Sequence, residues 1–271
     1  NSKYIQNYLG YGYKILNKSS ETFFNKIKKF ESGTNLIINL NSNSYKKEKY
    51  FNIKKEFTVK KTNGKDKVNK VIELLEQSLK LRLRSDVPIA FCLSGGIDSG
   101  SLVSLAKKKF NLDPKCYSII DKDKRYNEEK NIDYLKKKLN LNVKKIFIDK
   151  EKNFLSDLTK LIDYHDSPIS TISYYAHSKI SKAIKKDNFK VAISGTAADE
   201  IFSGYYDHYL YNLVDLKNKD LKLYNKEKKS WYYKIRPIVR NSYLKNLNNF
   251  IKNPLFNKHI YQNIKEGKKY F

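Results

Sequence analysis

The turn at residues 94–99, Ser-Gly-Gly-Ile-Asp-Ser, constrains the fold of this chain more than any other segment. An apolar run at residues 87–93 precedes it, and a helical pattern at residues 99–110 follows it. A buried strand that leads through a glycine-rich turn into a helix aims backbone N–H groups at one point, where the helix dipole favours an anion. The alternative is a strand-to-helix turn of the same shape without a ligand. The placement of the turn favours the anion site.

The side chains of the turn suit a bound phosphate. Gly95 and Gly96 let the backbone approach a phosphate with no Cβ in the way. Ser94 and Ser99 add hydroxyl donors, and Asp98 can hold a magnesium ion. No Gly-Lys-Ser/Thr follows the glycines, so the turn is not a Walker loop. It predicts a pyrophosphate loop, which is typical of enzymes that cleave ATP between its α and β phosphates.

Short apolar runs alternate with helical patterns through the middle of the chain. Strands are predicted at residues 89–93, 116–120, 143–148 and 191–194, and helices at residues 68–83, 99–110, 128–139, 154–164 and 173–185. This alternation is typical of an α/β fold, a parallel twisted sheet with helices on both faces. In such sheets the ligand lies beyond the carboxyl ends of the strands. Cys92 and Cys116 fall inside two of the strands, so we expect reduced, buried thiols.

A second motif follows the last predicted strand. Residues 194–200 are Ser-Gly-Thr-Ala-Ala-Asp-Glu, and this loop should lie at the same edge of the sheet as the first. Asp98 and Asp199 would then face one another, and two carboxylates with phosphate oxygens suit a magnesium ion on pyrophosphate. The alternative is that Asp199 and Glu200 form an acidic pair at a helix N-terminus.

The first sixty residues lack the strand–helix alternation. A strand is predicted at residues 36–40, a turn at residues 41–50 and a linker at residues 60–67. We therefore expect two parts, residues 1–62 and residues 63–271. The basic, aromatic tail at residues 231–271 is expected to be partly helical packing surface.

The composition limits which kinds of binding partner (nucleic acid, membrane or small molecule) we expect for this chain. The 271 residues carry a formal net charge of +27, but the lysines are spread along the whole chain. A solvated basic surface is therefore the expectation and a nucleic-acid partner the alternative. No apolar run reaches membrane-spanning length, and no secretory signal opens the sequence. We expect a cytoplasmic protein with anionic small-molecule substrates and no membrane partner.

The two motifs together resemble the glutamine-dependent asparagine synthase family. Ser-Asp-Val-Pro at residues 85–88 and Tyr-Ser-Ile at residues 117–119 are also similar to that family. Tyr-Leu-Gly-Tyr-Gly at residues 8–12, with residues 22–24 and 30–33, resembles the closing stretch of the family's glutaminase domain. The resemblance implies an adenine-nucleotide alpha-hydrolase-like domain over residues 63–271, truncated at its C-terminal end. Residues 1–62 would be the remnant of an α+β N-terminal-nucleophile glutaminase domain.

The resemblance also implies an activity. The family activates a carboxylate, aspartate, as an acyl-adenylate with release of pyrophosphate, and then amidates it with ammonia from glutamine. The implied substrates and cofactors are ATP, Mg²⁺, aspartate and glutamine-derived ammonia. A homodimer is one open alternative for the oligomeric state. Because the family's glutaminase nucleophile is not in this chain, we expect the fragment alone to be inactive. An interrupted domain exposes surface that its missing helices should cover, so we also expect poor solubility.

Site roles carry over from the family residue by residue. Asp98 and Asp199 would ligate magnesium. The remaining implied ATP-binding residues are Leu93, Ser94, Gly95, Gly96, Ser99, Ile119, Ser194 and Gly195.

Thr196 departs from the family pattern, which has a glutamate at this position. A threonine hydroxyl cannot act as a carboxylate base near neutral pH. The acceptor is therefore left between aspartate and another carboxylate, such as a sugar acid. Two further functions stay open: a tRNA-modifying enzyme with the same loop, and a non-catalytic nucleotide-binding module.

Overall fold

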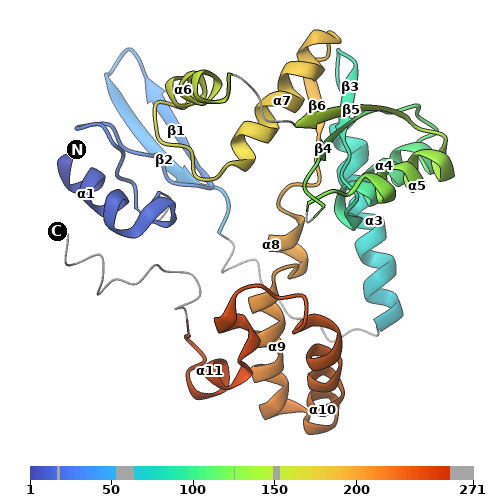
Figure 1. The fold of residues 1–271 in the computed structure, drawn as a ribbon. Coiled ribbons are helices and arrows are strands. Elements are labelled where there is room, and N and C mark those ends of the chain that lie inside the picture. The colour runs from blue at the N-terminus through green and yellow to red at the C-terminus, as the bar shows by residue number, and fades with distance from the viewer. Residues whose placement is uncertain (17–18, 53–63, 125, 149–152, 257–271) are drawn as a thin grey trace.

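The computed structural model describes residues 1–16, 19–52, 64–124, 126–148 and 153–256 (Figure 1). Six strands are defined in these ranges: β1 (Thr34–Asn39), β2 (Ser44–Lys49), β3 (Ile89–Cys92), β4 (Lys115–Asp121), β5 (Asn142–Ile148) and β6 (Val191–Ile193). The α-helices are α1 (Ser2–Tyr11), α3 (Gly64–Arg82), α4 (Ile97–Lys108), α5 (Glu129–Leu139), α6 (Phe154–His165), α7 (Ser173–Lys186), α8 (Ala198–Phe202), α9 (Tyr206–Lys219), α10 (Leu221–Ser230) and α11 (Leu247–Lys252). Short 3₁₀ turns, η1 (Gly12–Ile15) and η3 (Ser242–Lys245), and a π-helical turn, η2 (Trp231–Ile235), complete the order.

The central sheet is four-stranded, parallel and ordered β5-β4-β3-β6. Its strands and the helices between them lie where the alternation predicted them, which confirms the α/β class. The largest shift is at α4, which begins at Ile97 rather than Ser99 because its first turn belongs to the glycine-containing loop. Phe91 of β3 pairs with Cys116 of β4 and Ile193 of β6, so β3 lies in the interior of the sheet.

Helices cover both faces of this sheet. Phe91 joins a core with residues of α3, α4 and α5, among them Leu79, Val103 and Ile132. Its neighbour Ala90 points to the other face, where α7 contributes Ile184. Because successive strand residues alternate between faces, one apolar strand serves both cores.

The strand order reverses beside β3. The chain runs outward from β3 to β4 and β5, and then returns to place β6 on the opposite side of β3. In open α/β sheets, such a reversal leaves a crevice outside the carboxyl ends of the two strands at the switch point. The loops that follow β3 and β6 carry the two sequence motifs, so the topology brings them together.

The N-terminal part contains a correction. Residues 41–50 were predicted to be a turn, but β2 occupies residues 44–49 and pairs antiparallel with β1. Ladder hydrogen bonds to the apolar β1 favour a strand despite the polar sequence, and an Asn39 side chain that accepts from two backbone N–H groups fixes the turn between them. The predicted linker at residues 60–67 is also wrong in part, because α3 begins at Gly64. Residues 60–63 lie outside the described residues.

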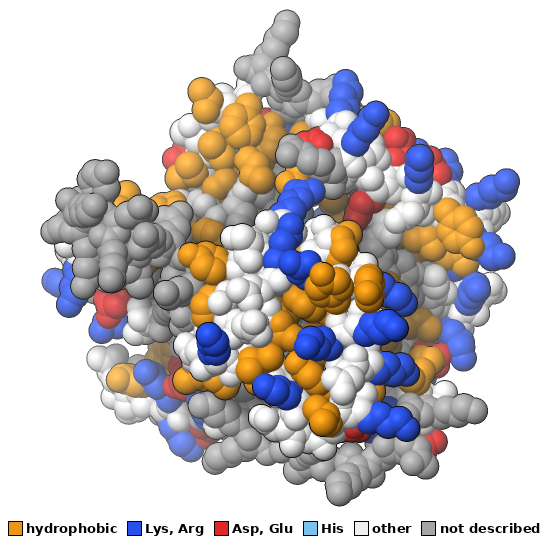
Figure 2. Space-filling view, turned by 60° about the horizontal axis from the view of Figure 1, so that its bottom comes forward, with side chains coloured by type: hydrophobic (Ala, Val, Ile, Leu, Met, Phe, Trp, Pro, Cys, Tyr) orange, Lys and Arg blue, Asp and Glu red, His pale blue; other side chains and the backbone are white. Residues whose placement is uncertain are grey.

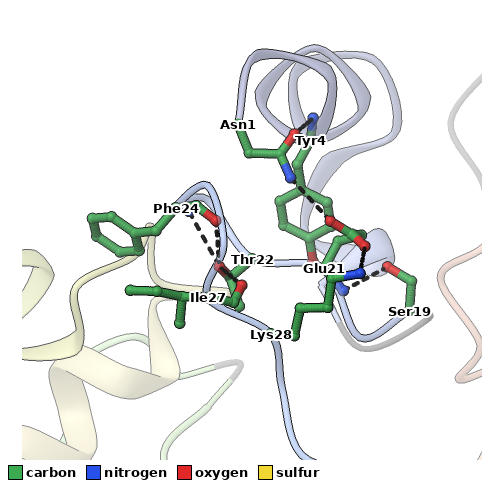
Figure 3. Close-up of polar contacts among 8 residues, drawn as sticks. All are labelled: Asn1, Tyr4, Ser19, Glu21, Thr22, Phe24, Ile27 and Lys28. Carbon is green, nitrogen blue, oxygen red and sulfur yellow. Dashed lines mark hydrogen bonds and ion pairs between the residues drawn. The ribbon is translucent and has the colours of Figure 1, made fainter.

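Polar contacts tie α1 to the segment that follows it (Figure 3). The Asn1 side chain accepts from Tyr4 N at 3.1 Å, which caps α1, and its amide donates to Glu21 at 3.2 Å. Thr22 donates its hydroxyl proton toward the carbonyl of Ile27, 2.7 Å away. Phe24 and Ile27 of this segment line a cavity together with residues 165–170, between α6 and α7.

The C-terminal helices form a second core. Seven buried residues make it up: Leu210, Leu213, Tyr224, Trp231, Leu247, Phe250 and Phe256. The expectation of a partly helical tail is confirmed over residues 231–252, and residues 257–271 lie outside the described residues. Figure 2, which brings the bottom of Figure 1 forward, shows lysine and arginine side chains scattered among hydrophobic ones. Among the described helices, none is long and apolar enough to cross a membrane.

Candidate functional site

The two motif loops touch at the crevice between β3 and β6. A Cβ on Gly195 would lie 2.8 Å from the backbone nitrogen of Ser99 and 3.1 Å from the Cβ of Asp98. Only glycine therefore allows the second loop to approach the first turn of α4 this closely. Because of this close approach, the two motif loops form one continuous surface at the carboxyl edge of the sheet, which is called the wall below.

This wall bounds a cavity of about 640 Å³ at the carboxyl edge of the sheet. Eight of the residues assigned from the sequence line it: Leu93, Ser94, Asp98, Ser99, Ile119, Ser194, Gly195 and Thr196. Three others, Gly95, Gly96 and Asp199, are not among the lining residues. The cavity therefore combines an apolar side with a polar rim from the two loops.

Asp199 lies in a different orientation from the one expected. Its carboxylate occupies the space that a side chain on Gly204 would fill, and Gly204 N donates to the Asp199 carbonyl at 2.9 Å. Of the predicted magnesium pair, only Asp98 faces the cavity. Within the described residues, no three His, Cys, Asp or Glu side chains gather closely enough to hold a metal ion. The described structure thus offers one of the two expected carboxylates at the cavity.

The serine hydroxyls of the first loop hold its shape. Ser94 N donates to Ser99 Oγ at 2.9 Å, the two hydroxyls are 2.9 Å apart, and Gly96 N donates to Ser94 Oγ at 3.2 Å. The α4 ladder begins with Gly100 N donating to Gly96 O. The N–H groups of residues 97–99 consequently have no carbonyl within the helix, and this first turn suits an anion.

The structure places Gly95 directly against the start of α5. A Cβ there would lie 2.8 Å from the Cβ atoms of both Glu128 and Asn131, at the start of α5. The absence of a side chain at Gly95 therefore makes room for α5.

Sequence reasoning missed part of the cavity wall. Asp121, Tyr126 and Glu128 come from the end of β4 and the segment after it, and Tyr175 and His177 come from α7. The topology was the available signal for the first three, because β4 ends at the same edge as β3. Tyr175 and His177 belong to α7, which packs on the sheet face opposite to α4 and α5. No sequence motif marks these two residues.

Thr196 and Glu200 differ in what they contact. The Thr196 hydroxyl lies 2.6 Å from that of Ser194, at the cavity wall. Glu200 instead accepts a 2.8 Å hydrogen bond from Tyr205, and this bond raises the pKa of that phenol to about 12. Glu200 is not among the lining residues, so the structure does not bring its carboxylate to the cavity beside Thr196.

The two cysteines occupy adjacent strands of the sheet and are free thiols. Cys116 is fully buried, and burial raises its thiol pKa to about 12. Cys92 is half-buried and lines the cavity, and burial raises its pKa as well. A raised pKa disfavours the thiolate, so neither cysteine is set up as a nucleophile.

The asparagine synthase family model matches residues 70–260, most of the chain. The chain belongs to the asparagine synthase family. Asparagine synthetase [glutamine-hydrolyzing] 1 of Bacillus subtilis is 31% identical over 183 residues, which cover 66% of this chain and 27% of that protein. Family membership supports an adenine nucleotide hydrolase-like fold and a domain of ATP-dependent amide ligases.

Other relatives differ in the activity that their names give. Asparagine synthetase [glutamine-hydrolyzing] 2 of Bacillus subtilis is 27% identical over 200 residues, 69% of this chain and 26% of that protein. Amidase chry2 of Gibberella zeae is 25% identical over 202 residues, 69% of this chain and 30% of that protein. The chain spans less than a third of each of these three relatives. The family is therefore fixed while the substrate is not.

Proposed function

We propose that this chain carries the synthetase site of an amide-forming ligase. The site would activate a carboxylate with ATP, release pyrophosphate and pass the acyl group to ammonia derived from glutamine. The observation that carries this proposal is the meeting of the two Ser-Gly loops at the switch point of the sheet, with Gly195 against Asp98 and Ser99.

ATP would bind across the two loops. Its phosphates would lie at the N–H groups of residues 97–99, which have no acceptor within α4. The adenosine would occupy the apolar side of the cavity, near Leu93 and Ile119 and beside Ser194 and Gly195. Adenylation turns the poor leaving group of a carboxylate into AMP, and the fixed N–H groups stabilise the charge on the departing pyrophosphate.

Magnesium is the expected partner of the pyrophosphate, whose charge it would neutralise. Asp98 fits this role, because its side chain faces the cavity. Asp199 would have to turn away from Gly204 before it could join Asp98. We therefore propose Asp98 as the first ligand and Asp199 as a ligand only after the loop at residues 194–204 rearranges.

Aspartate is the first candidate acceptor, and another carboxylate such as a sugar acid is the second. Thr196 is the reason to test both acceptors. Its hydroxyl forms a hydrogen bond with that of Ser194 and cannot take up a proton as a carboxylate does. Attack by ammonia still requires a proton acceptor, which solvent or another lining group would supply.

The domain division is part of the proposal. Residues 1–62 would be the end of a glutaminase domain, and residues 63–271 would belong to the synthetase domain. The separate β1–β2 hairpin and the start of α3 at Gly64 support a boundary in this region.

The test is the formation of AMP by the complete protein with Mg-ATP and ammonium, with and without aspartate. Aspartate-dependent AMP with an equal amount of asparagine supports the synthase. AMP that depends on another carboxylate keeps the chemistry and changes the acceptor. ATP binding without AMP from any carboxylate would favour a binding module, and AMP that requires tRNA would favour a tRNA-modifying enzyme.

A further inference from the structure

Two side chains at the start of α5 form hydrogen bonds to the backbone of the first motif loop. Gly95 N donates to Glu128 Oε2 at 3.0 Å, and the Asn131 amide donates to Gly95 O at 3.4 Å. Both polar backbone groups of one residue are thus held by side chains that follow it by more than thirty positions. We call this pair of contacts the Gly95 clamp.

The clamp rests on a rigid base. The Glu128 carbonyl accepts from Asn131 N and Ile132 N, at 3.0 and 3.1 Å, in the first turn of α5. Ile132 is fully buried in the same core cluster as Leu93, which directly precedes the loop. The clamp residues and the loop are therefore fixed to one core.

The clamp complements the serine contacts on the other side of the loop. Ser94 and Ser99 hold the loop to α4, whereas Glu128 and Asn131 hold it to α5. An anion site needs N–H groups that point in a fixed direction before the ligand arrives, since reorientation during binding costs free energy. A loop fixed from both sides meets this need.

We propose that Glu128 is a positioning residue for the nucleotide phosphates, acting through Gly95 with Asn131 as its partner. This inference rests on the proposed function, because it assigns the ligand of the loop to ATP. The contact requires a hydrogen-bond acceptor and not a charge. Glu128 in fact adds a negative charge to a wall that already contains Asp98 and Asp121, which disfavours a polyphosphate.

This distinction between acceptor and charge gives a sharp test. In Glu128→Gln the amide oxygen still accepts from Gly95 N, and the charge is removed. In Glu128→Ala the acceptor is lost. We expect Glu128→Gln to bind Mg-ATP at least as tightly as the wild type, and Glu128→Ala to bind it about tenfold more weakly.

The matched control is Glu129→Ala, one residue further along the same helical turn. Glu129 pairs with Lys145 at 2.8 Å and is not among the residues that line the cavity. Its loss should leave ATP binding unchanged. Asn131→Ala removes only the donor to Gly95 O and should weaken binding by a few-fold, so it carries the test if Glu128→Ala does not fold.

The experiment is calorimetric titration of the complete protein with Mg-ATP, together with hydrogen exchange of the loop amides without nucleotide. Faster exchange at Gly95 in Glu128→Ala, restored in Glu128→Gln, together with the ranking of affinities above, supports the proposal. Wild-type affinity in Glu128→Ala would overturn it while leaving the proposed function intact. A wild-type protein that binds no ATP would overturn both.

Discussion

Gly95 is the residue with the least room for change in the first loop. A Cβ there would collide with the Cβ atoms of Glu128 and Asn131, whose positions the backbone at the start of α5 fixes. We expect Gly95→Ala to lower the free energy of unfolding by about 1–3 kcal/mol and to abolish ATP binding. Denaturant unfolding and nucleotide titration measure the two effects.

Gly96→Ala is the matched control for this change. The nearest atom to a Cβ on Gly96 is Ser94 Oγ at 3.2 Å, and its φ of −81° suits any residue. The variant should lose less stability than Gly95→Ala. Equal losses would mean that contact with α5 is not what limits the loop.

The two cysteines should differ in reactivity toward a thiol-alkylating reagent. Cys92 lines the cavity, so we expect iodoacetamide to label it and Mg-ATP to protect it, whereas the fully buried Cys116 should stay unlabelled. Burial raises both pKa values, so the thiolate fraction is small at neutral pH and labelling of Cys92 should accelerate as pH rises.

Peptide mapping by mass spectrometry, with and without nucleotide, checks this pattern. Labelling of Cys116 before Cys92 would contradict the described burial. Labelling of Cys92 that saturating Mg-ATP does not slow would argue against nucleotide in this cavity.

At the scale of elements, the turn before α8 carries backbone strain. Ala197 has a φ of 74°, a left-handed conformation that costs an alanine about 1–2 kcal/mol. Glycine adopts it without that cost but loses more entropy on folding. We expect Ala197→Gly to raise the free energy of unfolding by about 0.5–1 kcal/mol, measured by thermal or denaturant melts.

Ala183→Gly, in the interior of α7, is the control for this substitution. There the backbone is helical, so glycine should lower stability by about 1 kcal/mol. A loss of stability in Ala197→Gly as large as that of the control would show that the left-handed turn is not strained.

The elements differ in how far their sequences predict them. The buried strands are short continuous apolar runs and their helices follow an apolar period of 3.6, so the sheet and its covering helices could be predicted. Strand β2 could not, because its lysines and glutamate give no apolar pattern and its partner β1 supplies the pairing. Local sequence predicted Ser94, Ser99, Ser194 and Gly195, which line the cavity, but the contact of Glu128 with Gly95 depends on how α5 packs, which no local pattern reveals.

At the scale of the molecule, apolar surface is distributed unevenly. The sheet and the C-terminal helices each have a core, whereas the β1–β2 hairpin is exposed on both faces. Ile37 and Ile38 of β1 are 50% and 58% exposed, and Val68 of α3 is 60% exposed. Exposed apolar surface on this scale favours self-association or aggregation of the chain.

We therefore expect residues 1–271 on their own to bind the dye ANS and to self-associate. Light scattering and dye fluorescence measure the two properties. A Leu36→Lys, Ile38→Lys double variant, which charges one face of β1, should reduce both. A monodisperse wild-type chain with no dye binding and a sharp cooperative melt would contradict this expectation.

The central claim is that this site cleaves ATP between its α and β phosphates to activate a carboxylate. The most direct measurement follows the products of α-labelled and γ-labelled ATP in the complete protein, with magnesium, ammonium and a panel of carboxylates that includes aspartate. The account predicts carboxylate-dependent label in AMP and in pyrophosphate, with both lost in Asp98→Asn. Carboxylate-dependent label in ADP and inorganic phosphate would contradict it.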